Sequence, residues 1–282
     1  MNRGKRVGRY NSSVTRVWPA LGALLRRDPT GLQWLSALTP SLPLNSSEPL
    51  LPETIQRREV KFGDLGTVSL PNCFEHEAAP PGRFLRWMIE NAGPSKAWNF
   101  RFSGNSDTET KRRKLLLGDL LVKKEALDRL SERGPKGSGR EWWAFEGFTS
   151  IDCCLETASF LLVIEGKRTE SLSSSTAYFN KRNQLARNLE VAQSLANDKN
   201  FAVLLIADQF LSDNDAENLI RDGLPHFSER EQASLARHYL GCISWQDVCD
   251  RTGLRGDLPG DKLPTNIDEA TRLLRGWGWM KR

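Results

Sequence analysis

The longest uninterrupted apolar run in this sequence covers residues 201–207 and reads FAVLLIA. A helix that crosses a membrane needs about 20 apolar residues, so this run is far too short to span a bilayer. Parallel strands at the centre of a sheet are buried on both faces and are typically apolar along their whole length. The run therefore predicts a buried, central, parallel strand and an α/β fold.

The segments before this run predict the rest of an α/β layer. Three stretches rich in aromatic and β-branched residues are typical of consecutive strands, at residues 141–147, 149–155 and 160–167. Apolar stripes predict a helix over about 109–130 and another over about 176–196. The order of helix, three-stranded meander, crossover helix and parallel strand predicts a mixed sheet with one right-handed crossover.

The rest of the chain flanks this predicted core, which we place at residues 109–212. Residues 1–108 are expected to hold a basic arm at 1–12, short helices, and a Pro-rich wrapping segment over 39–82. Residues 213–282 predict a helical C-terminal extension. The fold class expected from sequence is therefore α/β with helical additions at both ends.

The charge of the chain is mildly basic and unevenly placed. It has 40 Lys and Arg against 35 Asp and Glu, a net charge of +5, and its 39% hydrophobic content excludes a wholly disordered or collagen-like chain. Residues 1–27 contain seven Lys or Arg and no acid, and residues 111–114 are all basic and precede Lys123 and Lys124. These clusters indicate either solvated surfaces or contacts with phosphate groups.

The five cysteines indicate a reducing compartment. Their number is odd, and the adjacent Cys153 and Cys154 would point to opposite faces of a strand, which suits neither a shared disulfide nor a zinc site. The apolar stretch near the N-terminus ends at Arg26 and Arg27 without a small-residue cleavage site, which disfavours a signal peptide. We expect a cytoplasmic protein with no membrane partner.

Two carboxylates are predicted to lie side by side on the second and third strands of the meander. If Ala158 and Ser159 form the centre of an even-length hairpin loop, Asp152 lies directly opposite Glu165. Direct cross-strand partners share a face with their Cβ atoms about 5 Å apart, and Lys167 projects from the same face two residues further on. One edge of the sheet should therefore carry two carboxylates and an ammonium group.

This arrangement favours a divalent metal site. Two carboxylates so close repel each other unless a cation lies between them or one takes up a proton. The oxygens of Asp152 and Glu165, the Gly166 backbone carbonyl and water would suit Mg²⁺ or Mn²⁺, and Lys167 could orient or deprotonate a water or stabilise negative charge. The alternative is a salt-bridged surface patch of the same three side chains.

Asp152, followed after thirteen positions by Glu165-Gly166-Lys167, resembles the metal-binding signature of the PD-(D/E)XK nuclease superfamily. The resemblance implies a restriction-endonuclease-like αβββαβ core, with Asp152 and Glu165 as metal ligands and Lys167 as the catalytic lysine. Ile151 stands where the family name expects Pro. The match covers roughly residues 110–210.

The helix that follows the third strand supplies further candidates. Superfamily members often carry a Gln or Glu here that completes the active site, and Gln184 is the candidate in this sequence. Four neighbours are expected to contact nucleic acid, with Arg182 or Arg187 holding the scissile phosphate, the others being Lys181 and Asn188. The alternative for these positions is a solvated helix face. An additional acid is expected at Glu125, with Glu141 or Glu146 as alternatives.

These observations predict a metal-dependent phosphodiesterase acting on DNA, or less readily on RNA. The second interpretation is a nucleic-acid or protein-binding module without catalysis on the same fold. A nucleotide or sugar-phosphate enzyme is disfavoured because no Gly-rich phosphate loop follows any predicted strand. A homodimer is one arrangement that the sequence allows, and nothing in it selects endonuclease over exonuclease or a biological role.

Overall fold

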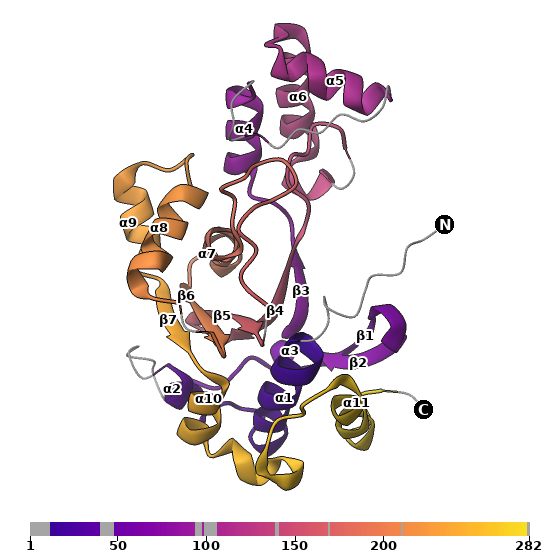
Figure 1. The fold of residues 1–282 in the computed structure, drawn as a ribbon, viewed down its shortest axis with the longest axis vertical. Coiled ribbons are helices and arrows are strands. Elements are labelled where there is room, and N and C mark those ends of the chain that lie inside the picture. The colour runs from indigo at the N-terminus through magenta and orange to yellow at the C-terminus, as the bar shows by residue number, and fades with distance from the viewer. Residues whose placement is uncertain are drawn as a thin grey trace.

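A computed structural model describes residues 12–39, 48–93, 98, 106–138, 141–168, 170–209 and 211–280, except for the side chain of Asp64. The expected basic arm at residues 1–12 lies outside this part of the chain, apart from Ser12. Figure 1 shows a sheet in the middle of the molecule, helices on both of its faces, and a group of helices projecting at one end of the long axis.

The described residues form a mixed sheet in the order β3-β4-β5-β6-β7. The strands β3, β4 and β5 are antiparallel neighbours, whereas β6 and β7 run parallel to β5. The bounds are Phe74–Ala78 for β3, Thr149–Glu156 for β4, Phe160–Lys167 for β5, Asn200–Ala207 for β6 and Tyr239–Ile243 for β7. The prediction of a buried, parallel strand with neighbours on both sides is confirmed by β6.

The first strand of the meander is not the one that the sequence predicted. Residues 141–147 form turns, and β3 pairs with β4 instead. The aromatic side chains of Trp142, Trp143 and Phe145 are buried among helices rather than in the sheet. A second strand that sequence analysis missed is β7, which lies within the C-terminal segment expected to be helical. The sheet thus takes strands from all three of the expected segments.

Helices cover both faces of the sheet. On one face, α7 (Gln184–Ala196), α8 (Asp213–Gly223) and α9 (Glu229–Ala236) pack over residues such as Val163 and Val203. On the other face, residues such as Ile164 and Leu204 meet a second group of helices. That group is the π-helical turn η2 (Ser13–Val17), α1 (Trp18–Arg27), α10 (Trp245–Thr252) and α11 (Ile267–Gly276).

The helices between β3 and β4 form a lobe with a hydrophobic core of its own. The lobe contains α4 (Gly82–Asn91), α5 (Asp107–Leu116), α6 (Leu120–Arg133) and the short η4 (Pro135–Gly137), with α5 and α6 at one end of the long axis in Figure 1. The single helix expected over 109–130 is interrupted because Gly118 adopts a φ of +84° and Asp119 caps the start of α6.

The remaining described elements are short. Arg57–Lys61 (β1) and Thr67–Pro71 (β2) form an antiparallel hairpin inside the segment expected to be an irregular wrapping segment. The others are α2 (Leu35–Leu38), α3 (Pro52–Ile55), η3 (Gly63–Leu65), η5 (Leu254–Asp257) and η6 (Pro259–Asp261). None of the helices in the described part of the chain combines the length and apolar character that a membrane span requires.

Candidate active site

The two predicted carboxylates meet on adjacent strands. The β4–β5 register pairs Cys153 with Ile164 and Leu155 with Leu162, which confirms the predicted hairpin and places Asp152 opposite Glu165. The Asp152 Oδ2 atom also accepts a hydrogen bond from the Gly166 backbone N–H at 2.9 Å. The acids therefore share the face of the sheet that α7 covers.

Glu165 is buried and is held by three side-chain donors. Its Oε1 atom lies 2.6 Å from the Lys167 Nζ and 2.7 Å from the Gln184 Nε2, and its Oε2 atom lies 2.9 Å from the Asn188 Nδ2. Gln184 is the first residue of α7. The Asn183 side chain caps this helix by accepting a hydrogen bond from the Ala186 N–H. The expectation that Asn188 contacts nucleic acid is corrected, because its amide donates to Glu165 and is fully buried.

Asp152 is held by donors at both oxygens and is surrounded by negative charge. The Ser13 hydroxyl, at the start of η2, donates to its Oδ1 at 2.8 Å. Burial raises the pKa of Asp152 well above its usual range, and the nearby charges of Glu165 and Glu75 raise it further, although Lys167 opposes them. The site thus keeps an acid in surroundings that favour its neutral form unless more positive charge is supplied.

Lys167 remains an ammonium group in this site. Burial disfavours its charge, but the carboxylates of Glu165 and Asp152 outweigh burial and raise the pKa of Lys167 above its ordinary value. Its backbone carbonyl accepts a hydrogen bond from the Trp245 Nε1 at 2.6 Å, which fixes the end of β5 from the opposite face. A charged lysine suits stabilisation of negative charge better than removal of a proton from water.

Sequence analysis missed a third acid, Glu75 on β3. The β3–β4 register places it opposite Asp152, and the Arg58 guanidinium donates to the Phe74 and Glu75 carbonyls at 2.8 and 2.6 Å. Its φ of +51° is rare for a residue with a Cβ atom, and its Oε1 atom is buried without a hydrogen-bond partner. Burial raises the pKa of Glu75 to about 7; contacts with the Ser13 and Trp18 side chains oppose this rise, whereas the Glu165 charge reinforces it.

The additional acids expected from sequence lie elsewhere. Glu125 on α6 forms an ion pair with Lys111 at 2.7 Å within the helical lobe and does not line the cleft that holds Asp152. Glu141 pairs with Arg133 at the edge of the same lobe. The expectation for Glu125 is therefore corrected, whereas Glu75 lines the cleft opposite Asp152. No motif marks Glu75, because its short strand reads Phe-Glu-His-Glu-Ala with no alternation of apolar and polar residues.

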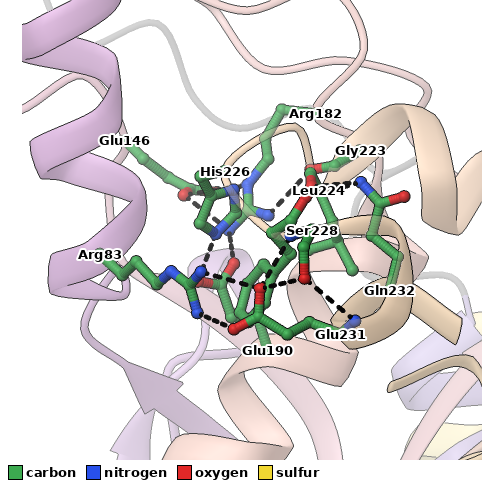
Figure 2. A network of polar contacts seen from close by, with 11 residues as sticks. Arg83, Glu146, Arg182, Glu190, Gly223, Leu224, His226, Ser228, Glu231 and Gln232 are labelled. Carbon is green, nitrogen blue, oxygen red and sulfur yellow. Dashed lines mark hydrogen bonds and ion pairs between the residues drawn. The ribbon is translucent and has the colours of Figure 1, made fainter. Parts of the chain in front are cut away.

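Arg182 does not face a ligand. Its side chain is fully buried, with the Nη2 atom 2.8 Å from Glu190 Oε2 and 3.1 Å from Glu146 Oε2, while its Nη1 atom donates to the Gly223 carbonyl at 3.2 Å. Figure 2 shows this network, in which His226 also contacts Glu190 at 2.8 Å. The expectation that Arg182 holds a phosphate is corrected, and the same contacts remove Glu146 from the candidate acids.

Lys181 and Arg187 have different surroundings. Lys181 is half exposed and pairs with Asp222 on α8 at 3.2 Å, and it does not line the cleft. Arg187 lines the cleft on the same helix as Gln184, and its Nε lies 3.9 Å from Glu146 Oε1. Of the three basic residues expected to contact nucleic acid, Arg187 is therefore the one that the structure brings to the site.

These groups lie in a cleft with a volume of about 1230 Å³. Its lining includes Asp152, Glu165 and Lys167, together with Arg187 and, from the β1–β2 hairpin, Arg58. A pocket for a small molecule measures about 300–1,000 Å³, so this cleft has room for part of a polymer. The walls combine basic side chains with an acidic floor.

The oxygen-rich floor suits a hard divalent cation. Asp152 and Glu165 lie beside the Lys167 ammonium group, and burial raises the pKa of both Asp152 and Glu75, with the charge of Glu165 raising both further. Among the described residues, no three His, Cys, Asp or Glu side chains are grouped as a protein-only metal centre requires. Mg²⁺ usually keeps several waters and takes one or two carboxylates, so Asp152 and Glu165 fit it without a third.

No family model, curated protein or solved structure matches this chain. The functional interpretation therefore depends on the geometry of the cleft and on the sequence motif.

Gly166 is expected to tolerate no side chain. A Cβ atom there would lie 2.2 Å from Val17 Cγ2 and 3.1 Å from Trp245 Cζ2. Gly166→Ala should therefore destabilise the fold by about 1–3 kcal/mol, measured as the free energy of unfolding in urea. Gly256→Ala, at a position with nothing within 4 Å of the added Cβ, is the control. Equal stability of the two variants would contradict this packing, whereas adding Val17→Ala should reduce the penalty of Gly166→Ala.

Glu75 is expected to destabilise the metal-free fold as the pH rises. Its pKa is about 7 in the folded state against 4.5 as the ordinary value, so the unfolded state ionises first and folding loses free energy between these two pH values. Glu75→Gln removes this loss, so the variant should gain up to about 3 kcal/mol over the wild type at pH 8 and much less near pH 4.5.

Urea unfolding at both pH values, in the presence of EDTA, measures the difference in free energy of unfolding between Glu75→Gln and the wild type. Glu77→Gln, at an exposed acid on the same strand, should leave the pH dependence as in the wild type. A Glu75→Gln variant whose stability tracks the wild type across this pH range would show that Glu75 is not a buried, ionisable member of the site.

Proposed function

We propose that this protein is a metal-dependent nuclease that hydrolyses phosphodiester bonds, with DNA as the preferred substrate. The single observation that carries the proposal is the placement of Asp152 opposite Glu165, with Lys167 donating to Glu165, on the floor of a cleft with basic walls. A structural salt bridge has no need of a second acid beside a buried one, whereas phosphodiester hydrolysis uses both a cation site and an ammonium group.

The order of the strands supports a restriction-endonuclease-like core. The antiparallel β3-β4-β5 meander, the crossover helix α7 and the parallel β6 are similar to the βββαβ part of the superfamily core, with Asp152 on the second strand and Glu165 and Lys167 on the third. This chain departs from that pattern by the helical lobe inserted between β3 and β4. It also differs in having Ile151 where the family name expects Pro, and in having the β1–β2 hairpin between its first helix and β3.

Asp152, Glu165 and the Gly166 carbonyl are the residues that would hold Mg²⁺ or Mn²⁺. The Gly166 N–H faces β4, and the N–H and C=O of one strand residue face the same neighbouring strand, so its carbonyl faces Asp152. When bound, such a metal lowers the pKa of a coordinated water and stabilises negative charge on a phosphoryl oxygen.

The protein's own side chains hold the reacting groups in place. Lys167 places positive charge beside Glu165 and can stabilise the charge that develops on the phosphate. Gln184 and Asn188 fix the Glu165 carboxylate by donating to its two oxygens, which keeps it oriented toward Asp152. Arg187 supplies a guanidinium at the wall of the cleft for a phosphate.

A non-catalytic nucleic-acid or protein-binding module is the second candidate. It is favoured by the contacts of Glu165, whose two oxygens already accept hydrogen bonds from Lys167, Gln184 and Asn188. A carboxylate satisfied in this way is stable without a cation. Measured cleavage separates the two candidates.

The protein is expected to cut DNA when Mg²⁺ or Mn²⁺ is added and to stop when EDTA is added. Supercoiled plasmid and linear duplex, analysed on gels, distinguish internal cuts from trimming of ends. Glu165→Gln and Lys167→Met should each reduce the rate at least about 100-fold, because they remove a metal ligand and the charge beside the phosphate. The exposed-residue variants Glu132→Gln and Lys262→Met should cut at the wild-type rate. Full activity in Glu165→Gln would remove this site from the mechanism.

Metal binding can be measured without cleavage. Calorimetric titration with Mn²⁺ should show binding to the wild type and to Lys262→Met, and a large loss of affinity in Asp152→Asn and Glu165→Gln. Heat of binding unchanged in both acid variants would place the cation elsewhere.

Arg187 is expected to contact a phosphate. Arg187→Gln should weaken binding of a fluorescein-labelled duplex in EDTA and reduce the slope of log affinity against log salt by about 1. Fluorescence anisotropy over a series of salt concentrations measures both quantities. Arg272→Gln, at an exposed position on α11, is the control. An unchanged salt slope in Arg187→Gln would show that this guanidinium makes no phosphate contact.

A further inference from the structure

The turn between α5 and α6 exposes three leucines that nothing in the described chain covers. Leu117, Leu120 and Leu121 are 79%, 77% and 82% exposed. Single exposed apolar residues are ordinary on protein surfaces, but a contiguous group marks an interaction site. We call these three residues the leucine turn.

The leucine turn is held rigidly in this exposed position. The Leu117 N–H donates to the Arg113 carbonyl at 3.1 Å and the Asp119 N–H to the Lys114 carbonyl at 3.0 Å. The Asp119 carboxylate then caps α6 by accepting from the Leu121 and Val122 N–H groups at 3.0 and 3.1 Å. Because the backbone is fixed before any partner binds, little conformational entropy is lost when the leucines are covered.

The leucine turn lies within the most basic part of the described chain. Residues 111–124 contain six Lys or Arg and one acid, Asp119; of the six, Lys111 pairs with Glu125 and Arg112 is held against Trp142 and Tyr178, which leaves Arg113, Lys114, Lys123 and Lys124 around the turn. Lys114 is exposed, and Lys124 is 76% exposed and pairs with Asp128 on its own helix. A second copy of this basic turn would be repelled, so the charge favours an anionic partner over self-association.

We propose that the leucine turn docks a DNA duplex, with its leucines inserted against the base stack from a groove and Lys114 and Lys124 on the flanking phosphates. A duplex combines a polyanionic surface with an apolar interior, which matches apolar side chains surrounded by basic ones. Leucine is among the side chains that wedge between base steps and kink a duplex. This inference rests on the proposed nuclease function and specifies a duplex, bent by the protein, as its substrate.

The position of the turn agrees with this role. Figure 1 shows α5 and α6 projecting from the end of the molecule, beyond the sheet that carries Asp152 and Glu165. The lobe is joined to the site through Glu146, which contacts both Arg182 and Arg187. A duplex held at the leucine turn is therefore held by a body that is fixed to the cleft.

The test combines binding and bending in EDTA, so that no cleavage is needed. In the triple variant Leu117→Ser, Leu120→Ser, Leu121→Ser, anisotropy should show affinity for a labelled duplex reduced at least about tenfold. Energy transfer between dyes at the two ends of the duplex should show loss of the bend. The salt slope should stay as in the wild type, because the phosphate contacts remain. Circular dichroism checks that the variant keeps its helices.

Two controls separate apolar insertion from charge and from general effects. Leu32→Ser changes a 42% exposed leucine outside the lobe and should leave binding and bending as in the wild type. Lys114→Gln with Lys124→Gln should reduce the salt slope by about 2 while the bend is retained. If the leucine triple variant binds and bends DNA as the wild type does, the inference is overturned.

Three other results would separate DNA docking at the leucine turn from a different partner there and from failure of the nuclease proposal. Loss of binding to phosphatidylglycerol–phosphatidylcholine vesicles with unchanged DNA binding would assign the turn to a membrane surface and overturn the inference. A dimer that the triple variant abolishes in gel filtration, again with unchanged DNA binding, would assign it to a second copy. If wild-type protein binds and bends DNA through the leucines but never cuts with Mg²⁺ or Mn²⁺, the inference stands and the nuclease proposal fails.

Discussion

The buried carboxylate of Glu165 is the constraint on which the site depends. An ionised acid removed from water is costly unless donors replace its hydration, and here Lys167, Gln184 and Asn188 do so from two elements. These contacts tie the end of β5 to the start of α7. A ligand that enters the cleft therefore meets a preformed polar floor. It binds either to this floor directly or together with a cation between Glu165 and Asp152.

A second buried charge cluster supports the first one. Arg182 precedes α7 and binds Glu146 from the helical lobe and Glu190 from within the helix, while its guanidinium lies 3.9 Å from the centre of the Phe84 ring on α4. Two carboxylates, a guanidinium and the aromatic face satisfy one another in a fully buried setting, so removal of one partner would leave an uncompensated charge. The network therefore fixes the first turn of α7, and with it Gln184.

Sequence predicted the parts of the site that depend on local pairing. The β4–β5 hairpin is closed by a short loop, so its register and the opposition of Asp152 and Glu165 follow from residue spacing. Glu75 depends on β3, which pairs with β4 across the whole inserted lobe and has no apolar alternation. The aromatics of residues 141–147 fit a strand pattern and a helical core equally well. Arg182 was misplaced because helical periodicity was applied to residues that precede the first turn of α7.

The acidic side chains of the cleft and the basic side chains of residues 111–124 lie in different parts of the fold. In the proposed nuclease, Asp152 and Glu165 on β4 and β5 would repel a polyanion when ionised unless a cation is bound, so the floor of the cleft alone would not attract DNA. The basic excess lies instead on residues 111–124, in a lobe with its own hydrophobic core that the sheet can accept between β3 and β4. Glu146 contacts both Arg182 and Arg187, so the proposed attraction of a polyanion and the proposed chemistry at the acids would occupy different but connected places in the fold.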